Sequence, residues 1–196
     1  MLSSNTAKQL MRRVLPVMLL LWLGNATAAK QVTVDGQTFQ DPVTEGGATL
    51  AMRGAMTYEY LFWTLYTAAL YLPADAKAAD VLSDVPKRLE LVYRREIERD
   101  AFIEAGNTVL ERSVAPAVLA RIQPQIAQLH KAYQDVAEGD RYVLAYDPGV
   151  GTSLDFNGKR VVTVPGAEFA AAYFAIWLGA EPLDEALRDT LLGRGS

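Results

Sequence analysis

The chain of 196 residues contains no cysteine, and its single histidine is His130. Without cysteine it has no disulfide framework, no thiol nucleophile and no thiol that could carry a lipid anchor. One histidine excludes a histidine-rich metal site, and a Ser-His-Asp triad would have to use His130. The run 149–151 (Gly-Val-Gly) lacks the Lys-Ser/Thr of a phosphate-binding loop and fits a turn between strands. The sequence therefore indicates no catalytic residue and no metal or cofactor site.

Positive charge is also scarce. The chain has 19 basic and 23 acidic side chains, and its formal net charge is −4. Residues 1–29 contain Lys8, Arg12 and Arg13 but no acidic side chain, so residues 30–196 are more acidic than the whole chain. An acidic domain has no electrostatic reason to bind nucleic acid or an anionic membrane surface. We therefore expect no nucleic-acid partner.

Residues 1–29 follow the order of a secretory signal peptide: basic side chains, then an apolar run at 14–23, then small residues. A membrane-spanning helix needs about 20 apolar residues, and this run is about half as long. It also contains a proline. We therefore predict cleavage near Ala28 or Ala29 and export to the periplasm or out of the cell. The mature protein would be one domain, residues 30–196, without a membrane span.

Alternating apolar and polar residues, together with β-branched and aromatic content, predict several strands in the mature domain. Asp35-Gly36 and Asn157-Gly158 are turn signals, and the second is the strongest sequence signal for a two-residue hairpin. The strands are expected at residues 31–34, 38–39, 49–52, 58–72, 86–97, 141–146, 153–156 and 161–164.

Apolar residues spaced three and four apart predict helices between and after these strands. The helices are expected at residues 76–82, 100–110, 115–136 with a kink at Pro124, 169–178 and 183–192. Strands before and after a central helical block favour an α+β fold. We predict an antiparallel sheet covered on one face by a helical layer.

Aromatic rings and hydroxyls are concentrated between Tyr58 and Tyr66, with Arg53 nearby; Tyr93 and Arg95 stand on a neighbouring predicted strand. A buried phenol or guanidinium needs polar partners. A cavity for a small amphipathic ligand would supply them, since rings would contact the apolar body and these five side chains its polar end. The alternative is a core of aromatic side chains with arginines extending to solvent.

At these residues the chain resembles the chalcone isomerase-like family over almost the whole mature domain, and most of all its exported bacterial branch. The resemblance is carried by residues 34–39 (Val-Asp-Gly-Gln-Thr-Phe), 54–55 (Gly-Ala), 65–73 (Leu-Tyr-Thr-Ala-Ala-Leu-Tyr-Leu-Pro), 86–91 (Pro-Lys-Arg-Leu-Glu-Leu), 148–152 (Pro-Gly-Val-Gly-Thr), 164–169 (Val-Pro-Gly-Ala-Glu-Phe) and 176–179 (Ile-Trp-Leu-Gly). It implies an open-faced β-sandwich with a ligand cleft between sheet and helices.

The resemblance also implies site residues. Plant enzymes of the family close a chalcone into a flavanone without a cofactor, using a strand arginine helped by Thr and Tyr hydroxyls. Fatty-acid-binding members hold a carboxylate with an arginine and a tyrosine. Tyr66 falls at the position of that tyrosine, and Tyr58 falls where exported relatives carry the arginine. Arg53 would replace that arginine only if the strand register or the loop differs.

Three hypotheses follow from the sequence. The first is an exported, non-catalytic protein that binds a small amphipathic molecule such as a fatty acid. The second is a cofactor-independent isomerase acting on an enone or chalcone-like substrate, with Arg53 or Arg95 in place of the usual arginine. The third is a periplasmic interaction or scaffold protein with a protein partner, its cleft filled by Phe62 and Trp63.

Overall fold

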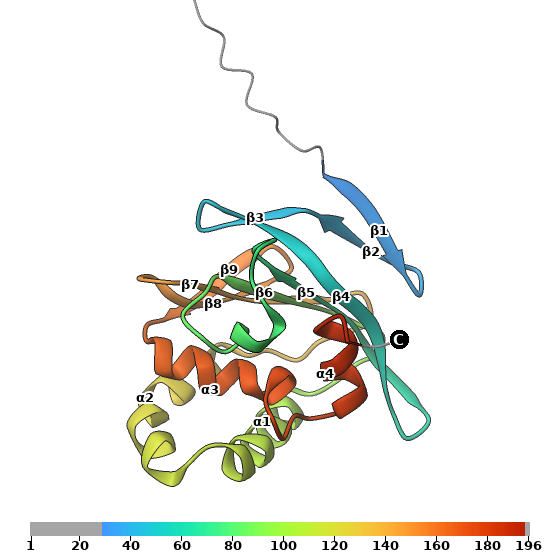
Figure 1. The fold of residues 1–196 in the computed structure, drawn as a ribbon. Coiled ribbons are helices and arrows are strands. Elements are labelled where there is room, and N and C mark those ends of the chain that lie inside the picture. Colours follow the sequence, from blue (N-terminus) through green and yellow to red (C-terminus); the bar gives the residue numbers. More distant parts are fainter. Residues whose placement is uncertain (1–28, 195–196) are drawn as a thin grey trace, which may run out of the picture.

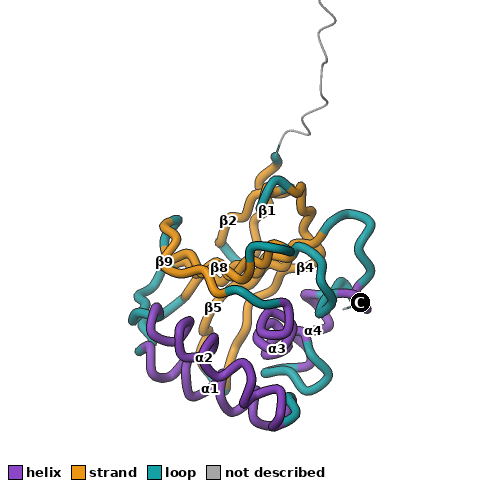
Figure 2. Tube along the Cα trace, turned by 90° about the vertical axis from the view of Figure 1, so that its left-hand side faces the viewer, coloured by secondary structure: helices purple, strands orange, loops and turns teal. Residues whose placement is uncertain are grey.

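The computed structural model describes residues 29–194, so the predicted signal peptide lies outside the described residues except for Ala29. In this part of the chain a curled, seven-stranded antiparallel sheet carries four α-helices on one face (Figure 1). Figure 2 shows the helices gathered on one side of the sheet and a separate two-stranded hairpin on the other. The predicted α+β class, with a helical layer on one face of an antiparallel sheet, is confirmed.

The sheet is a meander, because each strand from β3 to β9 pairs antiparallel with the next strand in the chain. The strands are β1 (Lys30–Val34), β2 (Gln37–Asp41), β3 (Val43–Glu45), β4 (Ala48–Tyr60), β5 (Trp63–Leu72), β6 (Lys87–Tyr93), β7 (Arg141–Asp147), β8 (Gly151–Phe156) and β9 (Lys159–Val164). The helices are α1 (Arg99–Ser113), α2 (Pro116–Ala132), α3 (Ala167–Leu178) and α4 (Glu185–Leu191), with a 3₁₀ turn η1 (Ala78–Asp80).

Two predicted hairpin turns are confirmed, and a third turn was missed. Asp35-Gly36 joins β1 to β2 and Asn157-Gly158 joins β8 to β9, with positive φ at all four residues. The single strand predicted at 58–72 is wrong, because the chain reverses at Leu61 and Phe62 and pairs Tyr60 with Trp63. Leu and Phe are not turn residues, so the sequence pattern gave no signal for this reversal.

Two other predicted elements are shorter than expected. The helix predicted at 76–82 is only the 3₁₀ turn η1, held by i→i+3 bonds such as that from the Asp80 N–H to the Lys77 carbonyl. A segment this short cannot offset the cost of starting an α-helix. The strand predicted at 86–97 ends at Tyr93, after which the chain leaves the sheet and Ile97 makes a single bridge to Val136.

The helix predicted at 115–136 ends earlier, at Ala132, because of the bridge between Ile97 and Val136. Val136 must be extended to exchange two backbone hydrogen bonds with Ile97, both 3.0 Å, so the helix stops before it. Pro124 lies inside the helix as predicted, and the predicted apolar stripe is buried at Ile122, Ile126 and Leu129. This stripe packs the helix into the core on the helical side of the sheet.

A β-bulge at Arg53 changes which side chains of β4 face the helices. Met52 pairs with Tyr71 and Gly54 pairs with Leu70, so Arg53 is the extra residue without a partner on β5. Even-numbered positions before the bulge, such as Leu50 and Met52, pack on the side of the sheet that faces the β1–β2 hairpin. Even-numbered positions after it, such as Met56 and Tyr58, pack on the helical side.

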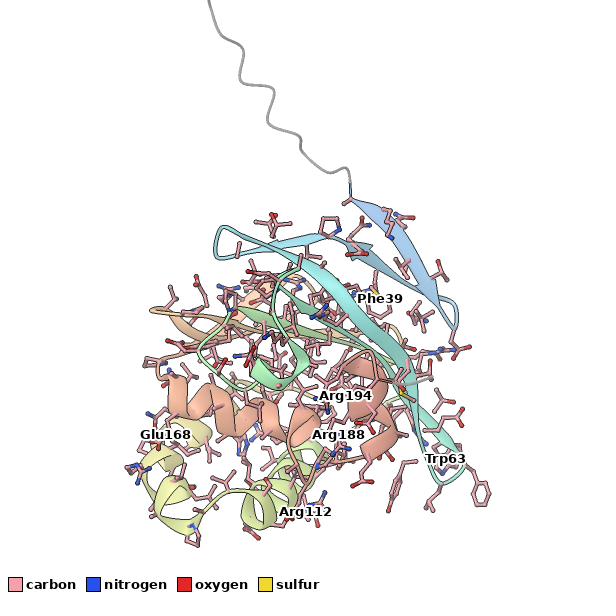
Figure 3. All side chains as sticks on the ribbon, in the orientation of Figure 1. Phe39, Trp63, Arg112, Glu168, Arg188 and Arg194 are labelled. Carbon is pink, nitrogen blue, oxygen red and sulfur yellow. The ribbon has the colours of Figure 1, made fainter. Side chains whose placement is uncertain are left out.

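The face of the sheet opposite the helices is closed by the β1–β2 hairpin and by ion pairs. Phe39 of the hairpin is buried against Tyr71 and Val92 of the sheet (Figure 3). Beside it, Arg88 forms ion pairs with Glu90 and Glu45, both at 2.8 Å. Since this face is covered, any sizeable cavity must lie on the helical side.

Gly54 sets the contact between β4 and α4. A Cβ at this position would lie 2.9 Å from the carbonyl oxygen of Leu191 and nearer still to that of Thr190. Real Cβ atoms do not approach backbone atoms so closely, so the helix can lie on the strand only because residue 54 has no side chain.

Replacing Gly54 with alanine is therefore expected to destabilise the domain by roughly 1–3 kcal/mol, because the methyl group would push α4 away from β4. The matched control is Gly106→Ala in α1, where the methyl group would meet only Ile176 Cδ1, at 3.6 Å. Its helical position should make that change neutral or stabilising by up to about 1 kcal/mol. Urea unfolding of both variants tests this. A Gly54→Ala protein as stable as wild type would contradict the close approach.

Candidate functional site

A cavity of about 650 Å³ lies between the sheet and the helical layer. Strands β4 to β8 supply one wall, and helices α1 and α3 supply the other. Most lining side chains are aliphatic or aromatic, including Leu91, Leu144, Val109 and Ile176. Protein interiors rarely leave voids of this size, so the cavity is the candidate functional site.

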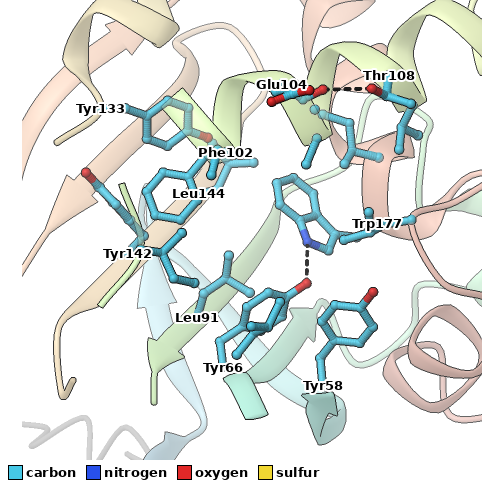
Figure 4. A pocket seen from close by; sticks show the side chains of 18 of the residues that line it. Tyr58, Tyr66, Leu91, Phe102, Glu104, Thr108, Tyr133, Tyr142, Leu144 and Trp177 are labelled. Atoms are coloured by element: carbon cyan, nitrogen blue, oxygen red, sulfur yellow. Dashed lines mark hydrogen bonds between the residues drawn. The ribbon is translucent and has the colours of Figure 1, made fainter. Parts of the chain in front are cut away.

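Three of the predicted site residues meet in this cavity. Tyr58, Tyr66 and Tyr93 stand on β4, β5 and β6, where Tyr58 pairs with Tyr66 and Tyr66 pairs with Tyr93. Their ring centroids are 5.3 and 5.8 Å apart, and all three side chains line the cavity, as Figure 4 shows for Tyr58 and Tyr66. Directly opposed residues of adjacent strands point to the same face, so the register explains this tyrosine row.

The tyrosine hydroxyls differ in their partners. The hydroxyl of Tyr66 accepts a hydrogen bond of 3.3 Å from Nε1 of Trp177 on α3. The hydroxyls of Tyr133 and Tyr173, further along the cavity wall, bond to each other at 3.0 Å. The hydroxyls of Tyr58 and Tyr93 have no hydrogen-bond partner within residues 29–194, although both rings are buried. These two groups are free to bond to a ligand.

The hydroxyls in the tyrosine row are neutral at physiological pH. Burial raises the pKa of Tyr66 and of Tyr93 well above the ordinary value for a phenol. Burial, reinforced by the nearby Asp184 carboxylate, raises the pKa of Tyr58 as well. These groups can therefore donate or accept hydrogen bonds, but they do not supply a phenolate base.

Charged side chains stand only at the edge of the cavity. Among the residues that line it in the described part of the chain, Glu104 and Arg112 carry the charges, and both are exposed. Both belong to α1, and the Arg112 guanidinium donates a hydrogen bond to the Pro182 carbonyl. The cavity thus combines an apolar interior, neutral hydroxyls, and one anion and one cation at its rim.

The two arginines predicted as site residues do not line the cavity. Arg53 is the bulged residue of β4, and its guanidinium donates to the carbonyl of Ala76. The Arg95 guanidinium lies over the ring of Trp63, 4.2 Å from the ring centroid. Trp63 and Phe62, which the scaffold hypothesis placed in the cleft, are instead 58% and 96% exposed.

Sequence reasoning missed the helical wall and Arg112. Phe102, Gly106 and Val109 follow one another at helical spacing along the inner face of α1, and all three line the cavity. Arg112 is the next position at this spacing. A cation that continues an apolar helical stripe is the sequence signal for this residue, and the strand pattern that points to Arg53 and Arg95 does not include it.

Outside the cavity, three features of the described residues could indicate a function: the histidine, groups of possible metal ligands, and long apolar helices. His130 on α2 does not line it, and burial lowers the pKa of its imidazole. Residues 29–194 contain no group of three or more His, Asp or Glu side chains placed to hold a metal ion. In the same part of the chain, no helix has the length and apolar character needed to cross a bilayer.

Comparisons with known proteins agree with this geometry. A family model described as chalcone isomerase-like matches residues 17–193. The crystal structure of a fatty-acid binding protein from Arabidopsis thaliana superposes with a TM-score of 0.65, covering 84% of this chain and 96% of that one. The two sequences are 16% identical, so this likeness shows a shared fold. None of the curated proteins matches the chain in sequence.

Proposed function

Because the chain belongs to the chalcone isomerase-like family, we propose that it binds a small amphipathic molecule such as a fatty acid, without catalysis. The observation that carries this proposal is the apolar cavity of about 650 Å³ with two unpartnered tyrosine hydroxyls. This volume is typical of small-molecule sites, which run from about 300 to 1,000 Å³. The structural neighbour that is a fatty-acid binding protein supports the same ligand class.

The apolar walls would bind the body of the ligand. Leu91 and Leu144 project from the strands towards Val109 and Ile176 on the helices. Each methylene that leaves water for such a site contributes about 0.8 kcal/mol. A chain of several methylenes therefore binds through these contacts before any polar group is added.

Two kinds of polar group would position the rest of the molecule. Arg112 at the rim suits a carboxylate, which can stay partly in water while its chain enters the cavity. The hydroxyls of Tyr58 and Tyr93 suit an oxygen further along the ligand, because neutral phenols bond to carbonyl or hydroxyl groups. The ligand would therefore be an acid, with its charge at the rim and its body inside.

The same geometry argues against isomerase activity. Closing an enone requires a fixed positive charge or strong donor where the oxyanion forms. The strand wall presents neutral Tyr58 at the position where the family resemblance places an arginine, while Arg53 and Arg95 bond elsewhere. Arg112 is at the rim and already donates to the Pro182 carbonyl.

Residues 1–29 support a second part of the proposal, that the protein is exported and cleaved near Ala28 or Ala29. The intact mass of the protein recovered from the periplasm or medium of its host should then lack these residues. Full-length protein that stays with the cell membrane would contradict export by a cleaved signal.

Protein purified from its host should carry a small amphipathic molecule, seen as added mass under native conditions and identified after denaturation. Tyr58→Phe and Tyr93→Phe should each weaken retention about three- to tenfold, because a neutral hydrogen bond contributes about 0.5–1.5 kcal/mol. The matched control is Tyr71→Phe on the opposite face of the sheet, whose buried hydroxyl is also unpartnered. It should retain the ligand fully. A protein without ligand that also binds no added fatty acid would overturn the proposal.

Replacing Arg112 with glutamine should weaken binding of a long-chain fatty acid about tenfold but leave its methyl ester unchanged, because only the acid pairs with the guanidinium. Displacement of a fluorescent fatty acid measures both affinities. Arg99→Gln is the control, since Arg99 is an exposed arginine of the same helix outside the cavity. An unchanged ratio of acid to ester affinity in Arg112→Gln would show that the head group lies elsewhere.

A further inference from the structure

The tip of the β4–β5 hairpin exposes four consecutive apolar or aromatic side chains. Tyr60, Leu61, Phe62 and Trp63 are 57, 75, 96 and 58% exposed. Figure 3 shows this hairpin projecting at one side of the molecule, beside the helical layer, with Trp63 near its end. Such large apolar side chains in sequence at a protruding tip indicate an interaction site.

The backbone of the tip shows that these residues are poorly suited to the turn itself. Leu61 has φ +56°, a left-handed conformation in which a side chain is disfavoured, and Phe62 does not share the positive φ. This sign pattern is that of a type II′ turn, which favours glycine at its first central position. The other two-residue turns, Asp35-Gly36, Gly46-Gly47 and Asn157-Gly158, have residues that suit their positive φ angles. At this turn alone among the four, large apolar side chains are present against the local preference.

The order of side chains matches the cross-section of a bilayer surface. Leu61 and Phe62 form the apex, where only apolar groups would enter the acyl region. Tyr60 and Trp63 flank them, and these are the residue types that gather at the level of lipid head groups. We infer that the Tyr60–Trp63 tip inserts into the surface of a lipid bilayer.

Charges beside the tip fit a neutral lipid surface. The Arg95 guanidinium stacks on Trp63, where it would lie at the level of lipid phosphates. Glu59 is exposed on the other strand, where its carboxylate accepts a hydrogen bond from Thr64 at 3.2 Å. One cation and one anion give no net attraction to anionic lipid, so insertion would rest on the apolar apex.

A membrane fits this surface better than a protein partner. Stable protein interfaces involve about 20–30 residues a side, whereas this patch is four residues long and convex. It also adjoins the cavity, because Tyr60 lines the cavity while its ring reaches the tip. Insertion would therefore place the cavity mouth at the source of an acyl ligand; this last step rests on the proposed function, but insertion itself does not.

The test is co-flotation of the protein, processed as its host leaves it, with phosphatidylcholine vesicles. The wild type should float, and flotation should not fall between about 0.1 and 0.5 M salt, where charge-driven binding is screened. Leu61→Gly with Phe62→Ser should reduce flotation about fivefold or more, because it removes the inserted apolar surface. The same change supplies the glycine that the turn favours, so the thermal midpoint should stay equal or rise.

Controls separate the tip from other parts of the molecule. Val150→Ser removes another exposed apolar side chain, 57% accessible, from the β7–β8 turn and should leave flotation unchanged. Brominated lipid should quench tryptophan fluorescence, and Trp63→Phe should remove much of that quenching, which separates the tip from any N-terminal contribution. Wild-type flotation by the Leu61→Gly/Phe62→Ser protein, with quenching unaffected by Trp63→Phe, would overturn the inference.

Two further outcomes keep this inference distinct from the proposed function. The Leu61→Gly/Phe62→Ser protein should bind a soluble fatty acid with wild-type affinity, whereas Tyr93→Phe should lose affinity and still float. Failure of fatty-acid binding alone would remove the ligand and leave the membrane contact. A wild type that does not float but forms a dimer through the tip would overturn the membrane contact in favour of a second copy of the chain.

Discussion

The bulge at Arg53 is the constraint on which the candidate site depends. In a strand without it, Gly54, Met56 and Tyr58 would share a face with Leu50 and would point towards the N-terminal hairpin. One extra residue reverses this alternation, so the second half of β4 faces the helices while the first half faces the hairpin. The long strand β4 thereby contributes to both cores.

The bulge also determines what Arg53 can do. An extra residue is not opposed across the ladder, and its side chain leaves the row that lines the cavity; here the guanidinium bonds to the Ala76 carbonyl. The neighbouring Gly54 removes the Cβ that would prevent α4 from packing on the strand. The pair Arg53-Gly54 therefore reverses the alternation of the strand and lets α4 pack on it at the same place, while the cavity lies between the tyrosine row and helices α1 and α3.

Much of this fold could be predicted from the sequence. Turn residues marked two hairpins, alternation marked the strand beginning at Lys87, and the spacing of Ile122, Ile126 and Leu129 marked a buried helical stripe. The reversal at Leu61 could not be predicted, because neither residue favours a turn. The bulge had a weak signal in Gly54, since an isolated glycine inside a strand often marks one. Tyr58, Tyr66 and Tyr93 were brought together as expected, but a sequence cannot say which arginine reaches a cavity formed by distant elements.

Residues that break local rules gather at one end of the molecule. Leu61 has a backbone conformation suited to glycine, Phe62 is almost wholly exposed, and Tyr58 has a buried ring whose hydroxyl has no partner. A single such feature means little: the hydroxyl of Tyr71 is equally unpartnered on the covered face, where nothing could bind it. The region around Tyr58 differs from the region around Tyr71 because several such features occur together there: the cavity and the apolar tip share Tyr60. Residues that contradict their local structural preferences and cluster beside an open cavity are typical of a functional site. Their position at an apolar tip agrees with a ligand that enters from an apolar phase.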